Sequence, residues 1–255
     1  MRKKKLFVFL LLSALCLQAQ TKEKKLNATE MFTSSITNTT YQVDIYVPES
    51  YEKSTSKYPI IYATDGQWVF EGFSKIVRET NKEVILVAIH QGPENRRLVD
   101  YLVPRFREYY RFLIAELLPY IEDKYRADTT NRTLAGTSAG GMLVGSVMLI
   151  EDPEKPHFTK YLSVDAPFTT YGHKMTTWAL ENERFKTSKK MKVTLFLSGA
   201  LAKGDLGPFD EDVTRFEKLL RSRKYDGLKI IRKSYDVDHY NIANPSFRDF
   251  LTQLF

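Results

Sequence analysis

One serine in the chain has the setting of a nucleophile. Residues 136–141 read Gly-Thr-Ser-Ala-Gly-Gly, which places Ser138 in the pattern G-x-S-x-G. A short apolar strand is predicted at 133–135 and a helix at 139–150. A tight strand–turn–helix holds such a serine exposed, and glycines two residues to either side avoid a clash. The sequence therefore predicts Ser138 as the nucleophile; the alternative is a glycine-rich helix start that merely packs.

A serine hydroxyl needs a general base, and His239 is the histidine best placed to supply it. It follows the last predicted strand, at 228–235, and precedes the last predicted helix, at 246–254. The base comes at this point when the chain order is nucleophile, acid, histidine. Of the other three histidines, His90 ends a predicted strand and is a candidate for lining the cleft. His173 follows a strand and is a candidate for overhanging the site, and His157 lies in a loop.

The third member of a triad is a carboxylate that holds the imidazole in the right tautomer. Its expected place follows the predicted strand at 193–197, where Asp205 is the first acidic residue. Asp205 is therefore the predicted acid. Three acidic residues shortly after it stay open as alternatives, although they also suit the first turn of a helix: Asp210, Glu211 and Asp212.

Two backbone amides should stabilise the negative charge on the attacked carbonyl oxygen. The amide of Ala139, directly after the serine, is one candidate. The other is the amide of Gly66 or Gln67, because Asp65-Gly66 is a turn signal that closes the apolar run at 58–64. One such donor contributes about 3 kcal/mol in the transition state. The alternative for this segment is an ordinary surface turn.

The elements that must position these residues alternate between strands and helices. Strands are predicted at 39–47, 58–64, 84–90, 133–135, 161–164, 193–197 and 228–235, and helices at 106–125, 139–150, 210–224 and 246–254. This alternation predicts an α/β fold with a mostly parallel, twisted sheet and helices on both faces. In such a sheet the chemistry lies at the carboxyl ends of the strands.

The first twenty residues have the layout of a secretory signal peptide. Four basic residues at 2–5 precede an apolar run at 6–17 and a small residue, Ala19. A run of twelve is too short to span a bilayer, so cleavage is favoured over a membrane anchor. We expect a signal peptide at 1–20, a single domain at 21–255, and a periplasmic or secreted protein with no membrane span after cleavage.

Charge and cysteine content argue against nucleic-acid binding and against cysteine chemistry. Removing the four leader residues from 38 Lys and Arg leaves 34, which against 31 Asp and Glu gives a formal charge of +3. No dense basic stripe remains, so a nucleic-acid partner is not expected. The only cysteine, Cys16, lies in the leader. The rest of the chain therefore has no disulfide, no thiol nucleophile and no cysteine-based metal site.

Four motifs together resemble one known family: Asp-Gly at 65–66, RLVDYLVP at 97–104, LPYIE at 118–122 and the serine motif at 136–141. The chain resembles the putative esterase family of α/β-hydrolases, which includes siderophore trilactone, feruloyl and other carbohydrate esterases, S-formylglutathione hydrolases and mycolyltransferases. The second motif is most similar to the siderophore-esterase branch. The resemblance implies the α/β-hydrolase fold, a Ser–His–acid mechanism and no metal or organic cofactor.

The chain departs from the family pattern near the predicted site. Thr137 and Ala139 stand where the family usually has histidine and a larger apolar residue. Asp165 stands where the family often has serine. A carboxylate there would bind a cationic or hydroxylated substrate or, as we prefer, cap the next segment.

Two further side chains are candidates for binding the substrate. Arg97, like Arg96, suits an anionic group, although we favour a pair between Arg97 and Asp100 that shapes the loop. Trp68 suits an aryl acyl group or a sugar, unless it packs in the core.

The sequence as a whole predicts an exported serine esterase that cleaves a small-molecule carboxylic ester, with a siderophore ester or an acylated carbohydrate as candidates. Two alternatives stay open: an acyltransferase on the same fold, and an inactive homologue that only binds a ligand. The sequence does not indicate an oligomeric state.

Overall fold

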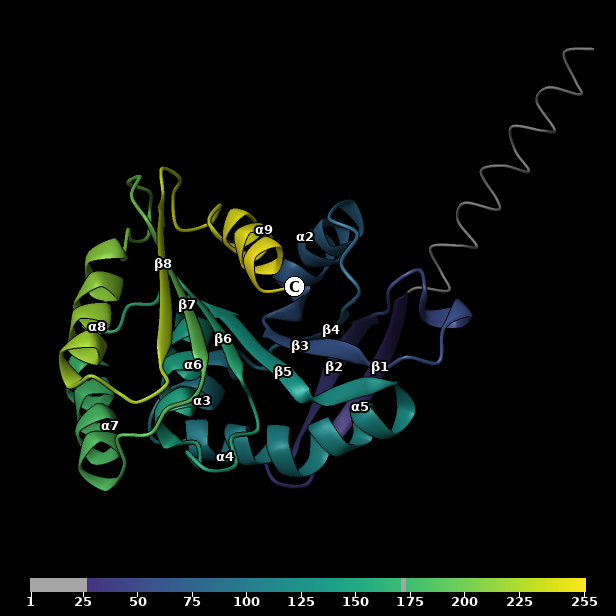
Figure 1. The fold of residues 1–255 in the computed structure, drawn as a ribbon, viewed down its shortest axis with the longest axis horizontal. Helices are drawn as coiled ribbons and strands as arrows, with labels where there is room; N and C mark the ends of the chain where they lie inside the picture. The colour runs from purple at the N-terminus through teal and green to yellow at the C-terminus, as the bar shows by residue number, and fades with distance from the viewer. Residues whose placement is uncertain (1–26, 171–172) are drawn as a thin grey trace, which may run out of the picture.

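The computed structural model describes residues 27–170 and 173–255. Its centre is an eight-stranded sheet in the spatial order β1-β2-β4-β3-β5-β6-β7-β8 (Figure 1). β2 pairs antiparallel with β1 and β4, and every other neighbouring pair is parallel. The strands are β1 (Asn27–Ser34), β2 (Thr39–Tyr46), β3 (Tyr58–Thr64), β4 (Ile85–Ile89), β5 (Ala127–Thr137), β6 (Lys160–Val164), β7 (Thr194–Ala200) and β8 (Lys229–Tyr235).

The central strands are buried on both faces. Every residue of β4 is buried, and Pro59 is the one residue of β3 that is not. This burial is the reason that both segments are unbroken apolar runs. The edge strand β8 differs, because it is exposed or half-buried and carries Lys229, Arg232 and Lys233. Charged side chains on an edge discourage pairing with another chain.

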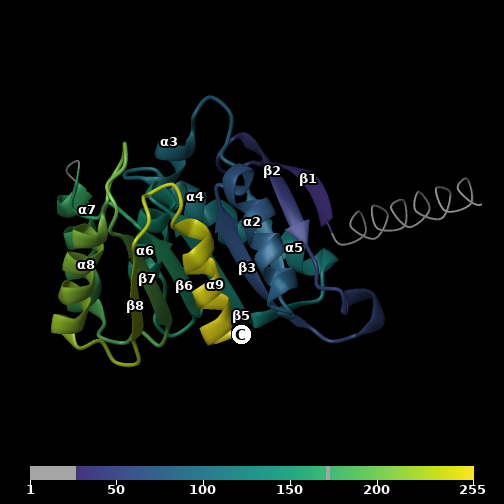
Figure 2. The same ribbon diagram turned by 90° about the horizontal axis from the view of Figure 1, so that it is seen from above.

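Helices pack on both faces of the sheet (Figures 1 and 2). The buried side chains form two apolar clusters, one on each face. One face is covered by α2 (Gly66–Glu79) and α9 (Ala243–Leu254). The other described helices cover the opposite face: α3 (Arg97–Tyr101), α4 (Phe106–Phe112), the π-helical turn η2 (Leu113–Leu117), α5 (Leu118–Lys124), α6 (Ala139–Ile150), α7 (His173–Thr187) and α8 (Asp210–Arg223). A short 3₁₀ turn, η1 (Tyr51–Lys53), precedes β3.

The two helices on the first face are joined by an aromatic stack. The rings of Phe73 in α2 and Phe247 in α9 are parallel within 2°, and their centroids are 3.8 Å apart. Both side chains are buried. Because α2 follows β3 and α9 follows β8, the stack connects segments that are far apart in the sequence. Figure 2 shows the two helices side by side.

The structure confirms the predicted α/β fold with its mostly parallel sheet and two covered faces. It also contains β1, which the sequence does not reveal, because this edge strand is mainly polar and only half-buried. The strand predicted at 133–135 begins earlier, at Ala127. Within 27–170 and 173–255, no helix is long and apolar enough to cross a membrane. The predicted leader at 1–20 lies outside the described residues.

We expect the Phe247→Ala variant to lower the free energy of unfolding by about 3–5 kcal/mol, because the lost ring leaves a cavity against Phe73. The Met31→Ala variant is the control, since Met31 is 65% exposed; its effect should stay below about 0.5 kcal/mol. Urea unfolding followed by circular dichroism measures both, and equally small effects would contradict the importance of the stack.

Candidate active site

The ends of β5 and β6 bring Ser138 and Asp165 to the same edge of the sheet. Thr137 pairs with Val164 in one ladder, and Val164 pairs with Ser198 in the next. Ser138 and Asp165 are the residues that follow, so the chain leaves both strands at the same level. This is the edge at which parallel α/β sheets bind their ligands.

Ser138 occupies a sharp turn between β5 and α6. Its backbone angles, φ 60° and ψ −122°, are unfavourable for a residue with a side chain. Its amide donates to the carbonyl of Val164 at 2.8 Å, which anchors the turn to β6. A Cβ atom at Gly136 would lie 2.4 Å from the backbone of Gly140, so the glycines of the motif allow the turn to close. The serine side chain does not cap α6.

His239 lies in the loop between β8 and α9 and is held by Asp165. Its Nδ1 atom is 2.6 Å from Oδ2 of Asp165, and Phe209 packs edge-on against the ring with centroids 5.2 Å apart. The other carboxylate oxygen, Oδ1, accepts hydrogen bonds from the amides of Ala200 at 2.9 Å and Phe209 at 3.2 Å. The carboxylate therefore has a fixed orientation and fixes the imidazole, which leaves Nε2 for proton transfer.

Asp205, the acid favoured by the sequence, does not occupy this position. Its side chain is exposed, whereas the carboxylate that contacts the Nδ1 atom of His239 is that of Asp165. β6 and β7 are neighbours in the sheet, so a loop after either strand reaches a histidine placed beyond β8. Chain order alone does not distinguish the two positions. The other three acids have different partners: Arg232 and Ser234 for Asp210, Arg215 for Glu211, and Thr169 and Thr170 for Asp212.

The sequence does carry a signal for Asp165. The residue follows an apolar strand directly, and that strand is the first after the serine motif. In the structure Asp165 has a positive φ of 43°, and its amide donates to the carbonyl of Ser198 at 2.7 Å. Its side chain is completely buried. This burial contradicts the expectation that Asp165 contacts a substrate, and its partners differ from those of a cap.

The three predicted oxyanion donors lie at the starts of two helices. Ala139 is the first residue of α6, and Gly66 and Gln67 are the first two residues of α2. Amides in the first turn of a helix have no partner within the helix, and the helix dipole places positive potential there. A Cβ atom at Gly66 would lie 2.7 Å from the carbonyl of Ala88, so glycine is needed where α2 approaches β4.

Arg97 has a different partner from the one expected. Asp100 accepts a hydrogen bond from Arg96 at 2.9 Å. Arg97 instead forms a two-bond ion pair with Asp65, with N···O distances of 2.7 and 2.9 Å, and donates to the carbonyl of Thr137 at 3.1 Å. Sequence reasoning missed the Asp65–Arg97 pair, because it depends on how α3 packs over the strand ends.

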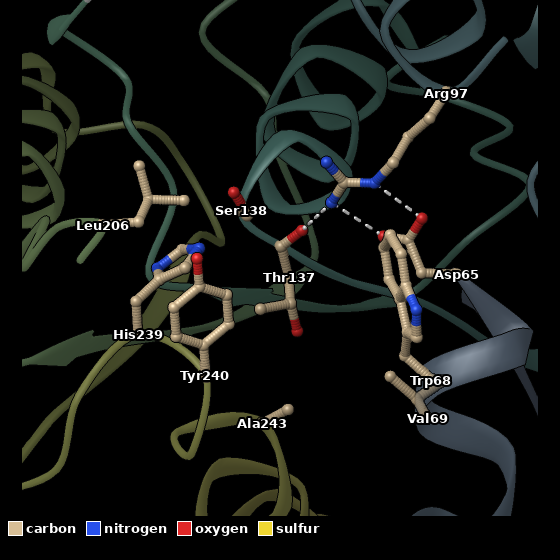
Figure 3. Close-up of a pocket in the computed structure, with 10 residues that line it drawn as sticks. All are labelled: Asp65, Trp68, Val69, Arg97, Thr137, Ser138, Leu206, His239, Tyr240 and Ala243. Atoms are coloured by element: carbon tan, nitrogen blue, oxygen red, sulfur yellow. Dashed lines mark hydrogen bonds and ion pairs between the residues drawn. The ribbon is translucent and has the colours of Figure 1, made fainter. Parts of the chain in front are cut away.

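A cavity of about 560 Å³ opens in front of Ser138 and His239 (Figure 3). Trp68 and Tyr240 lie on opposite sides of it and are 64% and 67% exposed. Val69, Leu206 and Ala243 add apolar lining, and Asp65, Arg97 and Thr137 complete it. The structure therefore places Trp68 at the cavity and not in the core, while its contact with a substrate stays a prediction.

The remaining histidines lie elsewhere or are not described. His90 packs beside Asp44, with Nε2 2.6 Å from the carboxylate, and lines a separate hollow. His157 contacts Glu151 and Tyr110 away from the cavity. The side chain of His173 lies outside the described residues. In the part of the chain that the structure describes, no cluster of three His, Cys, Asp or Glu side chains suits a metal ion.

Comparisons with solved structures support the fold. An IroE-like serine hydrolase from Shewanella oneidensis superposes with a TM-score of 0.75 at 22% identity, covering 90% of this chain and 80% of the other. The siderophore hydrolase EstB from Aspergillus nidulans gives 0.74 at 14% identity, with 89% and 94% covered. A ferulic acid esterase gives 0.64 at 19% identity, with 90% and 98% covered. No curated protein matches the sequence significantly.

The family comparison covers most of the chain. The family described as "Putative esterase" matches residues 34–250, which include the serine turn, the Asp165–His239 pair and the start of α2. The match confirms the resemblance seen in the four sequence motifs, and the α/β-hydrolase fold agrees with it. The chain therefore belongs to the putative esterase family and is a carboxylic ester hydrolase.

Proposed function

We propose that the protein is a serine esterase in which Ser138 is the nucleophile, His239 the general base and Asp165 the acid of the triad. One observation carries the proposal. The Asp165–His239 hydrogen bond lies at the sheet edge where Ser138 occupies a strained turn, and the serine and the histidine line one cavity. Strained turns of this kind are common at functional sites.

In the proposed reaction, the Oγ atom of Ser138 attacks the ester carbonyl carbon while Nε2 of His239 takes the hydroxyl proton. The tetrahedral intermediate then expels the alcohol, which receives that proton from the imidazolium. Water attacks the acyl-enzyme, again giving a proton to His239, and the carboxylic acid leaves as Ser138 regains its hydrogen. Asp165 stabilises the imidazolium in both half-reactions without itself being protonated.

The oxyanion in both half-reactions is assigned to the amides of Ala139 and of Gly66 or Gln67. These groups start two helices at the sheet edge, so their N–H bonds and both helix dipoles favour negative charge there. They are backbone groups on packed elements and need little reorganisation during the reaction.

The cavity favours a small ester with a flat or apolar group. Trp68 and Tyr240 offer exposed rings on either side, and Arg97, which also lines the cavity, is already paired with Asp65. The names of the similar structures include siderophore hydrolases and a ferulic acid esterase. Siderophore esters and acylated carbohydrates are therefore the substrate classes to screen first.

We also propose that the protein is exported, on the basis of the basic start and the apolar run within residues 1–20. Mass spectrometry of the native protein tests this directly. An intact N terminus on the active protein would contradict cleavage.

Ser138→Ala should lower turnover of p-nitrophenyl acetate by at least about 10³-fold, because the hydroxyl that forms the acyl-enzyme is lost. A fluorophosphonate probe should label the wild-type protein on Ser138 and leave the variant unlabelled. Ser222→Ala, remote in α8, is the matched control and should behave as wild type. Turnover by Ser138→Ala close to the wild-type rate would rule out this nucleophile.

Asp165→Asn should lower kcat by about 10³- to 10⁴-fold, because an amide does not hold His239 in the required tautomer. Asp205→Asn, at an exposed position, should leave kcat within about twofold, since substitutions away from buried networks have small effects. Steady-state kinetics on one ester compares the two variants. The reverse result would restore Asp205 as the acid.

A further inference from the structure

Arg97 joins the two segments that carry the proposed oxyanion donors. Its Nε and Nη2 atoms donate to the two carboxylate oxygens of Asp65, and Nη2 also donates to the carbonyl of Thr137 (Figure 3). Asp65 directly precedes Gly66, and Thr137 directly precedes Ser138. One side chain thus connects the end of β3 with the end of β5.

This connection is buried and held on several sides. The side chains of Arg97 and Asp65 are 17% and 2% exposed. The guanidinium carbon lies 5.4 Å from the ring centroid of Trp68 and 5.7 Å from that of Tyr101. Burial alone would lower the pKa of the Arg97 guanidinium, but the hydrogen bonds and the charge of Asp65 have the larger combined effect, so its pKa is raised. Burial raises the pKa of Asp65, an effect that Arg97 opposes. The two-bond geometry supports a permanent ion pair.

Asp65 makes this contact in place of a more usual one. It precedes α2 at the N-cap position, where an aspartate commonly accepts a hydrogen bond from the first turn, yet its side chain makes no such bond. Its carboxylate lies instead against the serine turn: a Cβ atom built at Gly140 would be 3.1 Å from Oδ2 of Asp65. The left-handed backbone of Asp65, with φ 62°, accompanies this arrangement.

We propose that Arg97 is a positioning residue that sets the distance between the two oxyanion donors, and that it is not a ligand for an anionic substrate. The inference rests on the proposed function, because Arg97 acts through the amides of Ala139 and of Gly66 or Gln67. A misplacement of about 1 Å at a reacting centre lowers the rate about 100-fold. Because Asp65 balances the charge of Arg97, the loss should be the same for neutral and anionic esters.

Arg96 offers a matched control. It is the preceding residue and also pairs with a buried aspartate, Asp100, at 2.9 Å. Asp100 accepts a further hydrogen bond from Tyr41, which lies in β2. Arg96→Gln therefore removes one arginine and one ion pair from the start of the same helix, α3, while leaving the connection between β3 and β5 in place.

The test compares Arg97→Gln and Arg97→Lys with Arg96→Gln on p-nitrophenyl acetate, which is neutral, and on mono-p-nitrophenyl succinate, which is anionic. We expect both Arg97 variants to lose about 30- to 100-fold in kcat on both esters, with KM changed by less than about threefold. Arg96→Gln should keep kcat within about threefold. A third variant, Arg97→Ala, leaves space for a guanidinium ion, so added methylguanidinium should restore part of its kcat. A general folding defect would not respond to that ion.

Several outcomes would overturn the inference. A loss confined to the anionic ester and seen as a raised KM would make Arg97 a substrate ligand, and an equal kcat loss in Arg96→Gln would make the effect nonspecific. If Arg97→Gln unfolds below the assay temperature, Asp65→Asn replaces it in the comparison. The double variant Asp65→Asn/Arg97→Lys should then lose no more kcat than the more impaired of the two single variants, because both substitutions remove the same ion pair. Failure of the proposed function is distinguishable, because the wild-type protein itself would then escape the fluorophosphonate probe.

Discussion

Three strands of the sheet end at the same edge, and each passes into its next segment through a residue with a positive φ. These residues are Asp65 after β3, Ser138 after β5 and Asp165 after β6, with φ values of 62°, 60° and 43°. Such backbone conformations cost about 1–3 kcal/mol each for residues other than glycine. They persist because buried ladders on both sides fix the strand ends. The candidate site is therefore a property of the sheet edge as a whole.

The proposed nucleophile and the proposed acid follow two neighbouring strands, with Ser138 after β5 and Asp165 after β6. Its carboxylate accepts the amide of Ala200 at the end of β7 and orients the imidazole of His239 beyond β8. One buried group thus ties three strand ends together while it holds the proposed base. The exposed loop around Asp205 is left free of this task. Such a loop tolerates changes in length and sequence better than the buried turn after β6.

The parts of the structure that could be predicted from the sequence are those with local causes. Apolar runs identify β3 and β4 because burial on both faces requires them, and the glycines around Ser138 identify the turn because only they let it close. The partner of His239 and the partner of Arg97 depend on which loops meet at the sheet edge. Chain order does not determine these meetings. Asp205 is predicted as the acid where the structure has Asp165, and Asp100 is predicted as the partner of Arg97 where the structure has Asp65. Weak alternation in the edge strand β1 likewise gives too little signal.

The stack of Phe73 on Phe247 has a consequence beyond the stability of the core. α2 starts with the amides proposed to bind the oxyanion, and α9 starts at Ala243, shortly after His239 in the chain. The paired rings therefore hold the two helices together. The proposed oxyanion donors lie at the start of α2, and the proposed base lies shortly before the start of α9. A shift of one helix relative to the other would change the distance between the proposed base and the proposed oxyanion donors. The packing of this face of the core therefore keeps the reacting groups aligned.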